Sequence, residues 1–454
     1  MSSPFRSLGV FNYRLWFAGA TVSNVGTWMQ RTAQDWIVLT ELTDHDAVAV
    51  GITTALQFGP VLLLTPLTGL AADVFDRRRL LLATQTAMAV IGAVFAALVL
   101  TGAVELWMVY GLAVALGVAS AFDGPARQAF VSELVPTSLI SNAVGLNATS
   151  FTVARLAGPA LAGLLTAAIG AGWVLLINAV TFAATITGIL AMRTAELHRQ
   201  PRSPRAPGRL RAGLLYVSSR GDLAVVVLSA LVFGAIGTNL PIIVATMSTV
   251  EFGLGPTEFG ILSSVVAIGS VIGAIAGARR ERARLSAIAL SALVFGLGAI
   301  GAAVSPDAWV FGAFLVVLGF TSLVIMNTTN AYLQAATPPE LRGRVMAIYI
   351  AVIIGGPTIG APAIGFIATE AGPRWAAAAG ALGGLVPALL FALWWVRAGR
   401  RASDAASASP PDQRGTAVFR ILRASTGSRT GSRAGSASLG GARTPRGVQS
   451  PGPE

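Results

Sequence analysis

The first apolar segment of the chain carries two opposite charges on one face. A helix turns about 100° per residue, so residues spaced by three and four project within about 60° of one another. Arg31 and Asp35 lie one turn apart and can neutralise each other. Charges inside an apolar span are costly and usually face the protein interior or a wet cavity. The pattern predicts that Asp35 binds and releases a proton with Arg31 as its counter-charge; a structural ion pair near the outer end of the span is the alternative. The polar face consists of Asn24, Trp28, Arg31, Gln34 and Asp35.

A third charge lies in the middle of the fifth apolar segment. Arg155 has no acidic residue one turn away on its own helix, so its partner must come from elsewhere. Three roles fit it: counter-charge to Asp35, ligand for an anionic substrate, or cap of a broken helix. Other polar residues are candidates for lining a cavity, although interhelical hydrogen bonds explain any single Asn equally well and packing explains Trp28. These candidates are Asn24, Trp28, Gln34, Asn147, Asn239 and Asn327.

Composition places these charges in a membrane protein. Of the 454 residues, 54% are hydrophobic and 11% are charged, whereas soluble domains carry about 25% charged residues. A membrane span needs about 20 predominantly apolar residues. The expected fold class is therefore an all-α membrane protein with twelve transmembrane helices. The expected spans are residues 15–40, 48–72, 80–101, 106–126, 142–169, 173–192, 223–248, 258–278, 285–304, 308–331, 345–369 and 374–398.

The two halves of the chain match each other at an offset of 202 residues. Most matched residues are Gly, Pro or Trp, whose geometry other residues rarely reproduce. A repeated half in a very apolar chain indicates a secondary transporter with its substrate site between the halves. The matched pairs are Trp107 and Trp309, Leu116-Gly117 and Leu318-Gly319, Pro136 and Pro338, Gly158 and Gly360, Gly163 and Gly365, Gly170 and Gly372, Trp173 and Trp375, and earlier Arg77-Arg78 and Arg279-Arg280.

The repeat divides the spans six and six. It predicts an N-terminal six-helix bundle over 1–192, a linker over 193–222, a C-terminal six-helix bundle over 223–398 and a disordered cytoplasmic tail over 399–454. Loops on one side hold nearly all the Arg residues, whereas Arg374 is the only basic residue in the loops of the other side. By the positive-inside rule both termini lie on the cytoplasmic side of a cell membrane. This asymmetry explains the net charge of +12, so nucleic-acid binding is not required.

The sequence lacks the residues that several classes of enzyme and metal site require. The chain has no Cys and no Lys, which removes thiol nucleophiles, Cys-based metal sites and P-loop ATP hydrolysis. No Ser-His-Asp or HExxH pattern occurs. Asp73 and Asp76 precede three Arg and have no acidic partner in the second half, which argues against a magnesium-dependent membrane enzyme. We expect no metal, no cofactor and no enzyme activity. A membrane enzyme or a channel is the alternative to a transporter.

The loop after the second span resembles the loop signature of the major facilitator superfamily. It runs from Gly69 through Asp73 to Arg77 and Arg78, and two intervening positions depart from the signature. The resemblance implies that the Asp and Arg bond to neighbouring helix ends and latch one face closed. Gly69 would allow close helix approach. A positive-inside loop with no gating role is the alternative.

A second charge pair lies near the cytoplasmic end of the fourth span. Asp123 and Arg127 are one turn apart. We expect them to form a structural latch with the Asp73 loop, and we group them with the gating residues.

The fifth span resembles the antiporter motif of the same superfamily. Gly145, Ala154, Gly158, Pro159 and Gly163 occupy its positions, with Ala at one of the usual Gly sites among them. Small residues recurring every four positions form a flat seam on which another helix packs without gaps. Pro159 removes one helical hydrogen bond and favours a kink. The resemblance implies a seam that opposes proton leak; ordinary small-residue packing is the alternative.

Further segments narrow the resemblance to the bacterial branch that holds the enterobactin exporter and macrolide efflux proteins. They are 27–36, 122–147 and 339–345. The resemblance covers about residues 5–398 and implies two pseudo-symmetric bundles rocking about a central cavity. It implies a monomer in the lipid bilayer that exports a small amphiphile (a siderophore, antibiotic or drug) in exchange for protons. A solute importer of the same fold is the alternative.

Overall fold

The computed structural model describes residues 5–198, 209–278 and 283–407, and these are helical without any strand. In this part of the chain, eleven helices are long and apolar enough to cross a membrane. The first helical rod, Phe11–Leu42, has the length but is less apolar because it carries Arg31, Asp35 and several amides. With it, twelve rods run through the described molecule.

The N-terminal bundle is built from the first six rods. The first rod ends in a π-helical segment, η2, whose wider turns accommodate an extra residue. The elements are α1 (Phe11–Trp36) with η2 (Ile37–Leu42), α2 (Ala47–Val74), α3 (Arg77–Leu100), α4 (Leu106–Glu133), α5 (Ile140–Ile169) and α6 (Ala171–Leu190).

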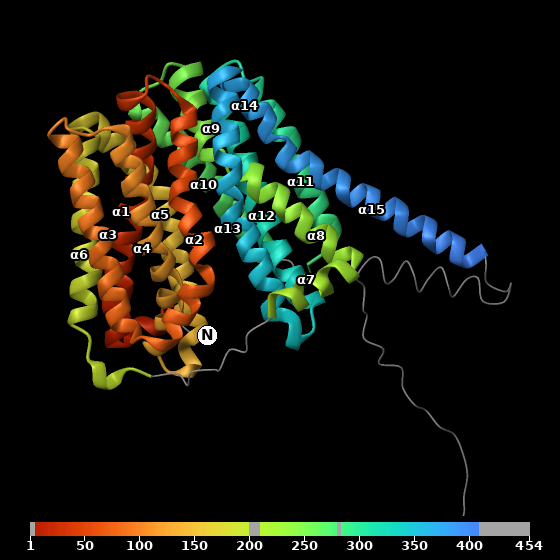
Figure 1. Ribbon diagram of the computed structural model, residues 1–454, viewed down its shortest axis with the longest axis horizontal. Coiled ribbons are helices and arrows are strands. Elements are labelled where there is room, and N and C mark those ends of the chain that lie inside the picture. Colours follow the sequence, from red (N-terminus) through yellow and green to blue (C-terminus); the bar gives the residue numbers. More distant parts are fainter. Residues whose placement is uncertain (1–4, 199–208, 279–282, 408–454) are drawn as a thin grey trace, which may run out of the picture.

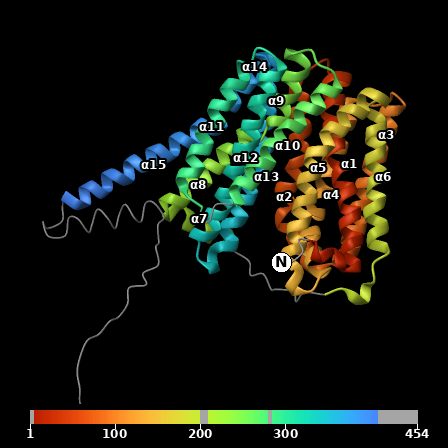
Figure 2. The ribbon, with the colours of Figure 1, turned by 180° about the vertical axis from the view of Figure 1, so that it is seen from behind.

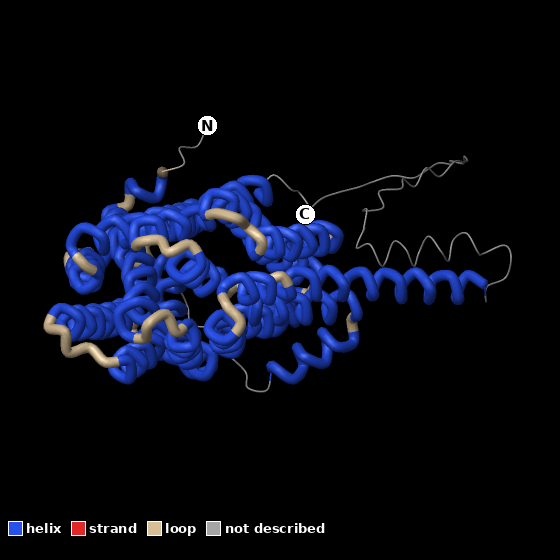
Figure 3. Tube along the Cα trace, turned by 90° about the horizontal axis from the view of Figure 1, so that it is seen from above, coloured by secondary structure: helices blue, strands red, loops and turns tan. Residues whose placement is uncertain are grey.

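The C-terminal bundle repeats this plan with more interruptions. Its first rod is broken by two π-helical segments, and its last rod continues well beyond the bundle as α15 (Figure 3). A short helix, α7, lies in the region expected to be linker. The elements are α7 (Arg209–Ser219), α8 (Gly221–Val232) with η5 (Phe233–Gly237), α9 (Leu240–Thr246) with η6 (Met247–Glu251), α10 (Pro256–Ala278), α11 (Leu285–Ala303), α12 (Ala308–Ala336), α13 (Pro339–Glu370), α14 (Pro373–Gly380) and α15 (Leu382–Ser407).

The internal repeat is visible in the backbone. Gly170 joins α5 to α6 with φ 91°, and Gly372 joins α13 to α14 with φ 101°. Both values lie in the left-handed region, which only Gly adopts without strain. Each half therefore makes the same corner with a Gly, and the two glycines are 202 residues apart in the chain.

The two ends of the bundles differ in how the bundles meet (Figures 1 and 2). We call the end where α7 lies the linker face, and the end with α9 and α14 the distal face. The bundles lie closer together at the distal face. There a single hydrophobic core contains residues of both bundles, for example Leu39 and Ile364. Toward the linker face each bundle has a core of its own, one around Trp16 and the other around Phe391.

Aspartates fix where several of these helices begin. Asp46 accepts a hydrogen bond from the Val48 amide at 2.8 Å at the start of α2. Asp307 does the same for the first amides of α12, at 2.9 and 3.0 Å. A side-chain oxygen at this position satisfies an amide that has no partner within the helix. These caps place the distal ends of α2 and α12.

Candidate functional site

The polar face of α1 lies between the two bundles and gathers aromatic rings around Arg31. The Cζ atom of this residue lies 5.2 Å from the ring centroid of Trp28 and 5.1 Å from that of Phe58 on α2. Phe151 of α5 meets Trp28 edge to face, with centroids 5.8 Å apart. The Arg31 Nε atom is buried and has no hydrogen-bond acceptor. The guanidinium is therefore held by ring faces rather than by a carboxylate.

Arg155 reaches the same ring from α5. Its Cζ atom lies 5.9 Å from the Trp28 centroid. Its Nη2 donates to the Ser270 hydroxyl of α10 at 3.3 Å, and the Ser270 oxygen lies 3.2 Å from the Gly319 carbonyl oxygen of α12. Because α5 and α10 belong to different bundles, Arg155 makes a polar contact across the centre of the molecule.

Asp35 lies on the same rod but forms no close ion pair. Within the described residues, no nitrogen of Arg31 or Arg155 comes within 4.0 Å of an acidic oxygen. The neutralisation that the one-turn spacing allows is therefore not realised as a direct contact in this state. Asp35 and both guanidiniums are partly buried, and none of them is in a close ion pair.

Glycines bring the bundles into contact at the distal face along two pairs of helices. A Cβ atom on Gly163 of α5 would lie 2.9 Å from the Cα of Gly260 on α10. A Cβ atom on Gly51 of α2 would lie 2.5 Å from the carbonyl oxygen of Ala361 on α13. Real Cβ atoms do not tolerate such separations, so only Gly permits these approaches. We call the two contacts the distal seams.

The two distal seams are related by the internal repeat. Gly365 of α13, the repeat partner of Gly163, packs against Ala47 and Val48 of α2. Gly260 and Gly51 each occupy the fifth position of their helices. The α5·α10 and α2·α13 contacts are thus equivalent, and together they close the molecule on both sides of its pseudo-symmetry axis.

Two side-chain contacts reinforce the closure. The Thr369 hydroxyl of α13 donates to Asp46 at 2.9 Å, and the Ala47 amide donates to the Thr369 oxygen at 3.0 Å. Trp36 of α1 stacks on Phe259 of α10 with centroids 6.1 Å apart. Sequence reasoning missed these contacts and the glycines of α2 and α10. The signal was weak: α2 and α10 begin 209 residues apart, and Gly51-Ile52 matches Gly260-Ile261 at that offset rather than at 202.

The small residues of α5 do not all face one partner. Gly158 packs against α1, where an added Cβ would lie 3.1 Å from the Val25 carbonyl oxygen. Gly163 packs across the seam on α10, and Pro159 lies beside Gly260 at the same seam. Ala154 is fully buried. Gly145 is exposed and has no neighbour within 4 Å of an added Cβ. The small residues of α5 therefore form two contacts, one with α1 of the same bundle and one with α10 of the other bundle.

The predicted gating loop is bonded within the N-terminal bundle. Arg77 Nη1 donates to Glu133 Oε1 at 2.5 Å, which ties α3 to the end of α4. Arg78 Nε donates to the Ile189 carbonyl oxygen at 3.1 Å, at the end of α6. Gly69 and Asp73 lie in the last turns of α2, and their side-chain environment is outside the described part of the structure, as are Arg279 and Arg280.

Asp123 and Arg127 form an ion pair at 3.0 Å between Arg127 Nε and Asp123 Oδ2. Asp123 Oδ1 also accepts from Thr84 Oγ1 at 2.9 Å and from Gln85 Nε2 at 2.7 Å, both on α3. Arg127 lies 5.4 Å from the ring centroid of Trp16 on α1. The pair therefore connects α1, α3 and α4 beneath the surface of the linker face.

The other cavity candidates have different surroundings. Asn239 is 2% exposed and donates to the Ala235 carbonyl oxygen at 2.6 Å, which satisfies the backbone where the first rod of the second half is broken. Gln34 is buried, Asn24 and Asn147 are partly buried, and Asn327 is exposed. The structure thus brings Arg31 and Arg155 together at Trp28, with Asp35 one turn from Arg31, but it does not bring all the amides there.

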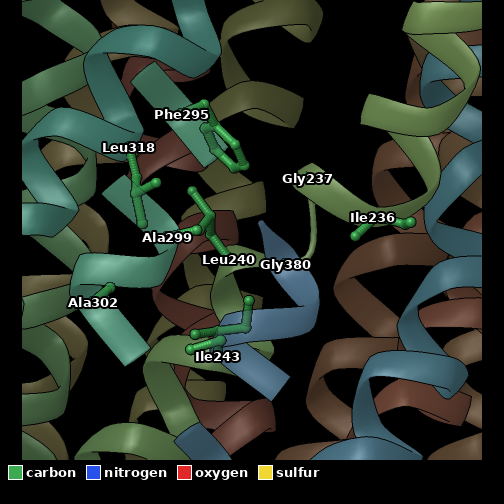
Figure 4. A pocket seen from close by; sticks show the side chains of 10 residues that line it. Ile236, Gly237, Leu240, Ile243, Phe295, Ala299, Ala302, Leu318 and Gly380 are labelled. Atoms are coloured by element: carbon green, nitrogen blue, oxygen red, sulfur yellow. The ribbon is translucent and has the colours of Figure 1, made fainter. Parts of the chain in front are cut away.

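A small cavity inside the C-terminal bundle is a separate feature (Figure 4). Its volume is about 10 Å³, room for about one water molecule, and its lining is almost entirely apolar. Leu240, Phe295, Leu318 and Gly380 are among the residues around it. A cavity of this size does not hold a transported amphiphile, and we regard it as a packing void.

The chain is similar in sequence to known membrane transport proteins. The sequence model of a family described as transmembrane secretion effector matches residues 2–420. The staphyloferrin A transporter of Staphylococcus aureus is 23% identical over 338 residues, which cover 74% of this chain and 84% of that protein. The enterobactin exporter of Salmonella typhimurium is 23% identical over 358 residues, 78% of this chain and 85% of that protein.

A solved structure shares the fold. A bacterial homolog of the human lysosomal transporter Spinster superposes with a TM-score of 0.64 at 16% sequence identity. The match covers 87% of this chain and 97% of that one. The two-bundle architecture is thus found in a known transporter structure.

Proposed function

Since the chain belongs to the transmembrane secretion effector family of the major facilitator superfamily, we propose that it exports a small amphiphilic molecule by alternating access, in exchange for protons. Family and relatives are transporters, not enzymes. The chain is accordingly a multi-pass membrane transporter. The two relatives are named as a transporter of staphyloferrin A and an exporter of enterobactin, and this supports a small-molecule cargo for this chain.

The distal seams are the observation that carries the proposal. The bundles meet through backbone contacts at one face and have separate cores at the other. Rocking of the bundles about the polar centre would part the seams and bring the linker-face ends together. The described state is then the one in which the distal side is sealed and cargo enters from the linker face.

Orientation in the membrane follows from the Arg distribution. The linker face carries Arg77, Arg78, Arg127, Arg193 and further Arg residues, whereas Arg374 lies at the distal face, bonded to Glu251. By the positive-inside rule the linker face is cytoplasmic. Both termini then lie in the cytoplasm, the lipid bilayer surrounds the bundles, and the transporter acts as a monomer.

Asp35 is our candidate for proton coupling, with Arg31 and Arg155 as the charges that respond to it. Arg31 and Arg155 lie against Trp28 between the bundles, and Asp35 lies one turn from Arg31 toward the distal end of the first rod. None of the three is neutralised by a close ion pair. A proton gained from the distal side would change the charge of this centre and reset the carrier. Gly69, Asp73, Arg77 and Arg78 would support gating at the linker face, together with Asp123 and Arg127.

Spin labels test alternating access without knowledge of the cargo. The natural chain has no Cys, so labels attach only where Cys is introduced. Thr101→Cys with Val304→Cys reports the distal face, and Arg79→Cys with Arg284→Cys reports the linker face; all four side chains are exposed. Acidification should lengthen the distal distance and shorten the linker-face distance, because the bundles rock as rigid bodies.

The same labels examine the coupling residue. In Asp35→Asn the distances should no longer respond to acidification, whereas the exposed control Arg193→Gln should respond as the parent does. Distances that never change in opposite directions would refute alternating access. Proton movement in inside-out vesicles that is driven by enterobactin and unchanged in Asp35→Asn would remove Asp35 from the mechanism.

A further inference from the structure

The centre of the transporter holds more positive than negative charge. Arg31 and Arg155 both lie against the ring of Trp28. On the rods around them, Asp35 is the one acid outside a terminal turn: α5 has none, Asp73 is in the last turn of α2, and Glu258 is in the first turn of α10. Two guanidiniums therefore lie beside one ring, and the carboxylate of Asp35, one turn along the rod from Arg31, forms no close ion pair with either.

Both guanidiniums also have unused donors. An Arg side chain carries five N–H donors. Arg31 makes no hydrogen bond within the described structure, and its Nε is buried. Arg155 makes one side-chain hydrogen bond, to the Ser270 hydroxyl at 3.3 Å, which is long for a charged donor. A buried charge without partners is unfavourable unless a ligand supplies them.

We propose that Arg31 and Arg155 form a subsite for an anionic group of the cargo, such as a carboxylate, with the apolar body of the cargo lying on Trp28, Phe58 and Phe151. A carboxylate accepts several N–H donors at once and cancels the excess charge. A cation would instead add to it. The three rings provide apolar surface directly beside the guanidiniums. This inference rests on the proposed transport function and names its substrate class as amphiphilic anions.

The subsite also connects binding to the bundle contact. Arg155 is the residue that reaches across to Ser270 of the other bundle. An anion bound to the unused donors of Arg155 lies on the same guanidinium as the Ser270 hydroxyl. Loading the subsite therefore acts directly on a residue that joins the bundles at their centre.

Three matched probes test the charge preference. They are 2-naphthoate, 2-naphthamide and 2-naphthylmethylammonium, which share an aromatic body and differ in charge. Binding to the full chain in lipid nanodiscs should favour naphthoate over naphthamide by about tenfold to a hundredfold, the range expected for hydrogen bonds to a charged group. The ammonium probe should bind least. Equal binding of the carboxylate and the amide, or no binding of the carboxylate, overturns the subsite.

Variants then locate the site. Arg155→Gln and Arg31→Gln should each remove most of the preference for naphthoate, whereas Arg155→Lys should retain part of it because the charge remains. Arg193→Gln, an exposed Arg paired with Glu196, is the control and should leave all three affinities unchanged. A preference that survives in both Gln variants places the anion elsewhere and contradicts the proposal. If a Gln variant does not fold, the probe ranking in the unaltered chain still decides.

The label distances separate this inference from the proposed function. If the label distances alternate but the chain does not prefer naphthoate over naphthamide, alternating access is supported and the anion subsite is refuted. If the label distances never alternate but the chain binds naphthoate through Arg155, the transport cycle is refuted and the anion subsite is supported.

Discussion

The Nη2 atom of Arg155 lies 3.3 Å from the Ser270 hydroxyl, and this contact joins the two bundles at their centre. The Ser270 oxygen also lies within hydrogen-bond distance of backbone carbonyls of α10 and α12, at 3.0 and 3.2 Å. The serine is therefore held in place by its own bundle while it accepts a donor from the other. Such a contact must break whenever the bundles move apart at this level.

Removing the serine hydroxyl should shift the balance between the two states. In Ser270→Ala the contact with Arg155 is lost, so the distal-closed state loses about 1 kcal/mol, the net value of a typical hydrogen bond. The labelled pair at 101 and 304 should then show a larger fraction of the long distance. Ser291→Ala, a buried serine within the C-terminal bundle, is the control. An unaltered distance distribution in Ser270→Ala would show that the contact does not contribute.

Closure of the distal face should depend on Gly163. In Gly163→Ala the new Cβ collides with the Pro256 carbonyl oxygen and lies 2.9 Å from the Cα of Gly260. The bundles then cannot close at the distal seam, and we expect transport to fall while the protein remains in the membrane. Gly145→Ala lies on the same helix with open space around the added Cβ. It should transport normally, and normal transport by both variants would disprove the seam.

Gly158 should affect folding rather than gating. Its neighbours Val25 and Met29 belong to α1 of the same bundle, at 3.1 and 3.2 Å from an added Cβ. Gly158→Leu therefore overfills an intrabundle contact, and overpacking costs about 1–3 kcal/mol. Thermal unfolding in detergent should show a lower midpoint for this variant. A stable Gly158→Leu protein that is blocked in transport would instead favour a gating role.

Asp35→Asn should strengthen anion binding at the proposed subsite. The substitution removes the negative charge one turn from Arg31, so naphthoate affinity should rise by about threefold to tenfold. Naphthamide, which is neutral, should bind as before and serves as the control. Weaker naphthoate binding in Asp35→Asn would indicate that Asp35 supports the anion instead of competing with it.

The ion pair between Arg77 and Glu133 should stabilise the N-terminal bundle. Its side chains are 13% and 12% exposed, so solvent screens the pair only weakly. Glu133→Gln leaves the Arg77 guanidinium without this charged partner and should lower the free energy of unfolding by about 1–3 kcal/mol. Thermal melts would measure the loss, with the exposed Glu196→Gln as the control. Equal melting temperatures for the two variants would contradict this prediction.

The repeat at offset 202 predicted a large part of the architecture. Gly170 and Gly372 adopt the same left-handed corner, and Gly163 and Gly365 make the same kind of contact. These features were accessible because close approach and positive φ both demand Gly. The partners of those glycines on α2 and α10 were not found, because these two helices correspond at an offset of 209 rather than 202.

The side-chain pairing at the centre was harder to predict. One-turn spacing on a helix permits an ion pair but does not require it, and the aromatic rings that hold Arg31 include Phe58 from another helix. Asn239 was expected to line the cavity, yet it donates to the backbone where η5 interrupts the rod. A π-helical segment is as apolar as the rest of the rod, so the hydropathy pattern does not reveal it. The carbonyl group that needs a hydrogen-bond donor at the break therefore could not be anticipated.

The helix limits in the linker and tail also differ from expectation. α7 occupies 209–219 within the region expected to be linker, and Gly213 of α7 packs against Arg344. α15 continues to Ser407, beyond the expected end of the last span at 398. The remaining tail, 408–454, lies outside the described residues. Helix propensity carries such segments past the apolar boundary on which the span limits were based.

The distal seams are formed from main-chain atoms and hydrogens rather than from functional side chains. Mutation of the residues around Trp28 can therefore alter which compound is accepted without rebuilding the barrier that holds back ions. Arg155 is where cargo selection and bundle contact meet, while the seams themselves are independent of it, so a lineage can explore new cargoes while its watertight closure stays unchanged.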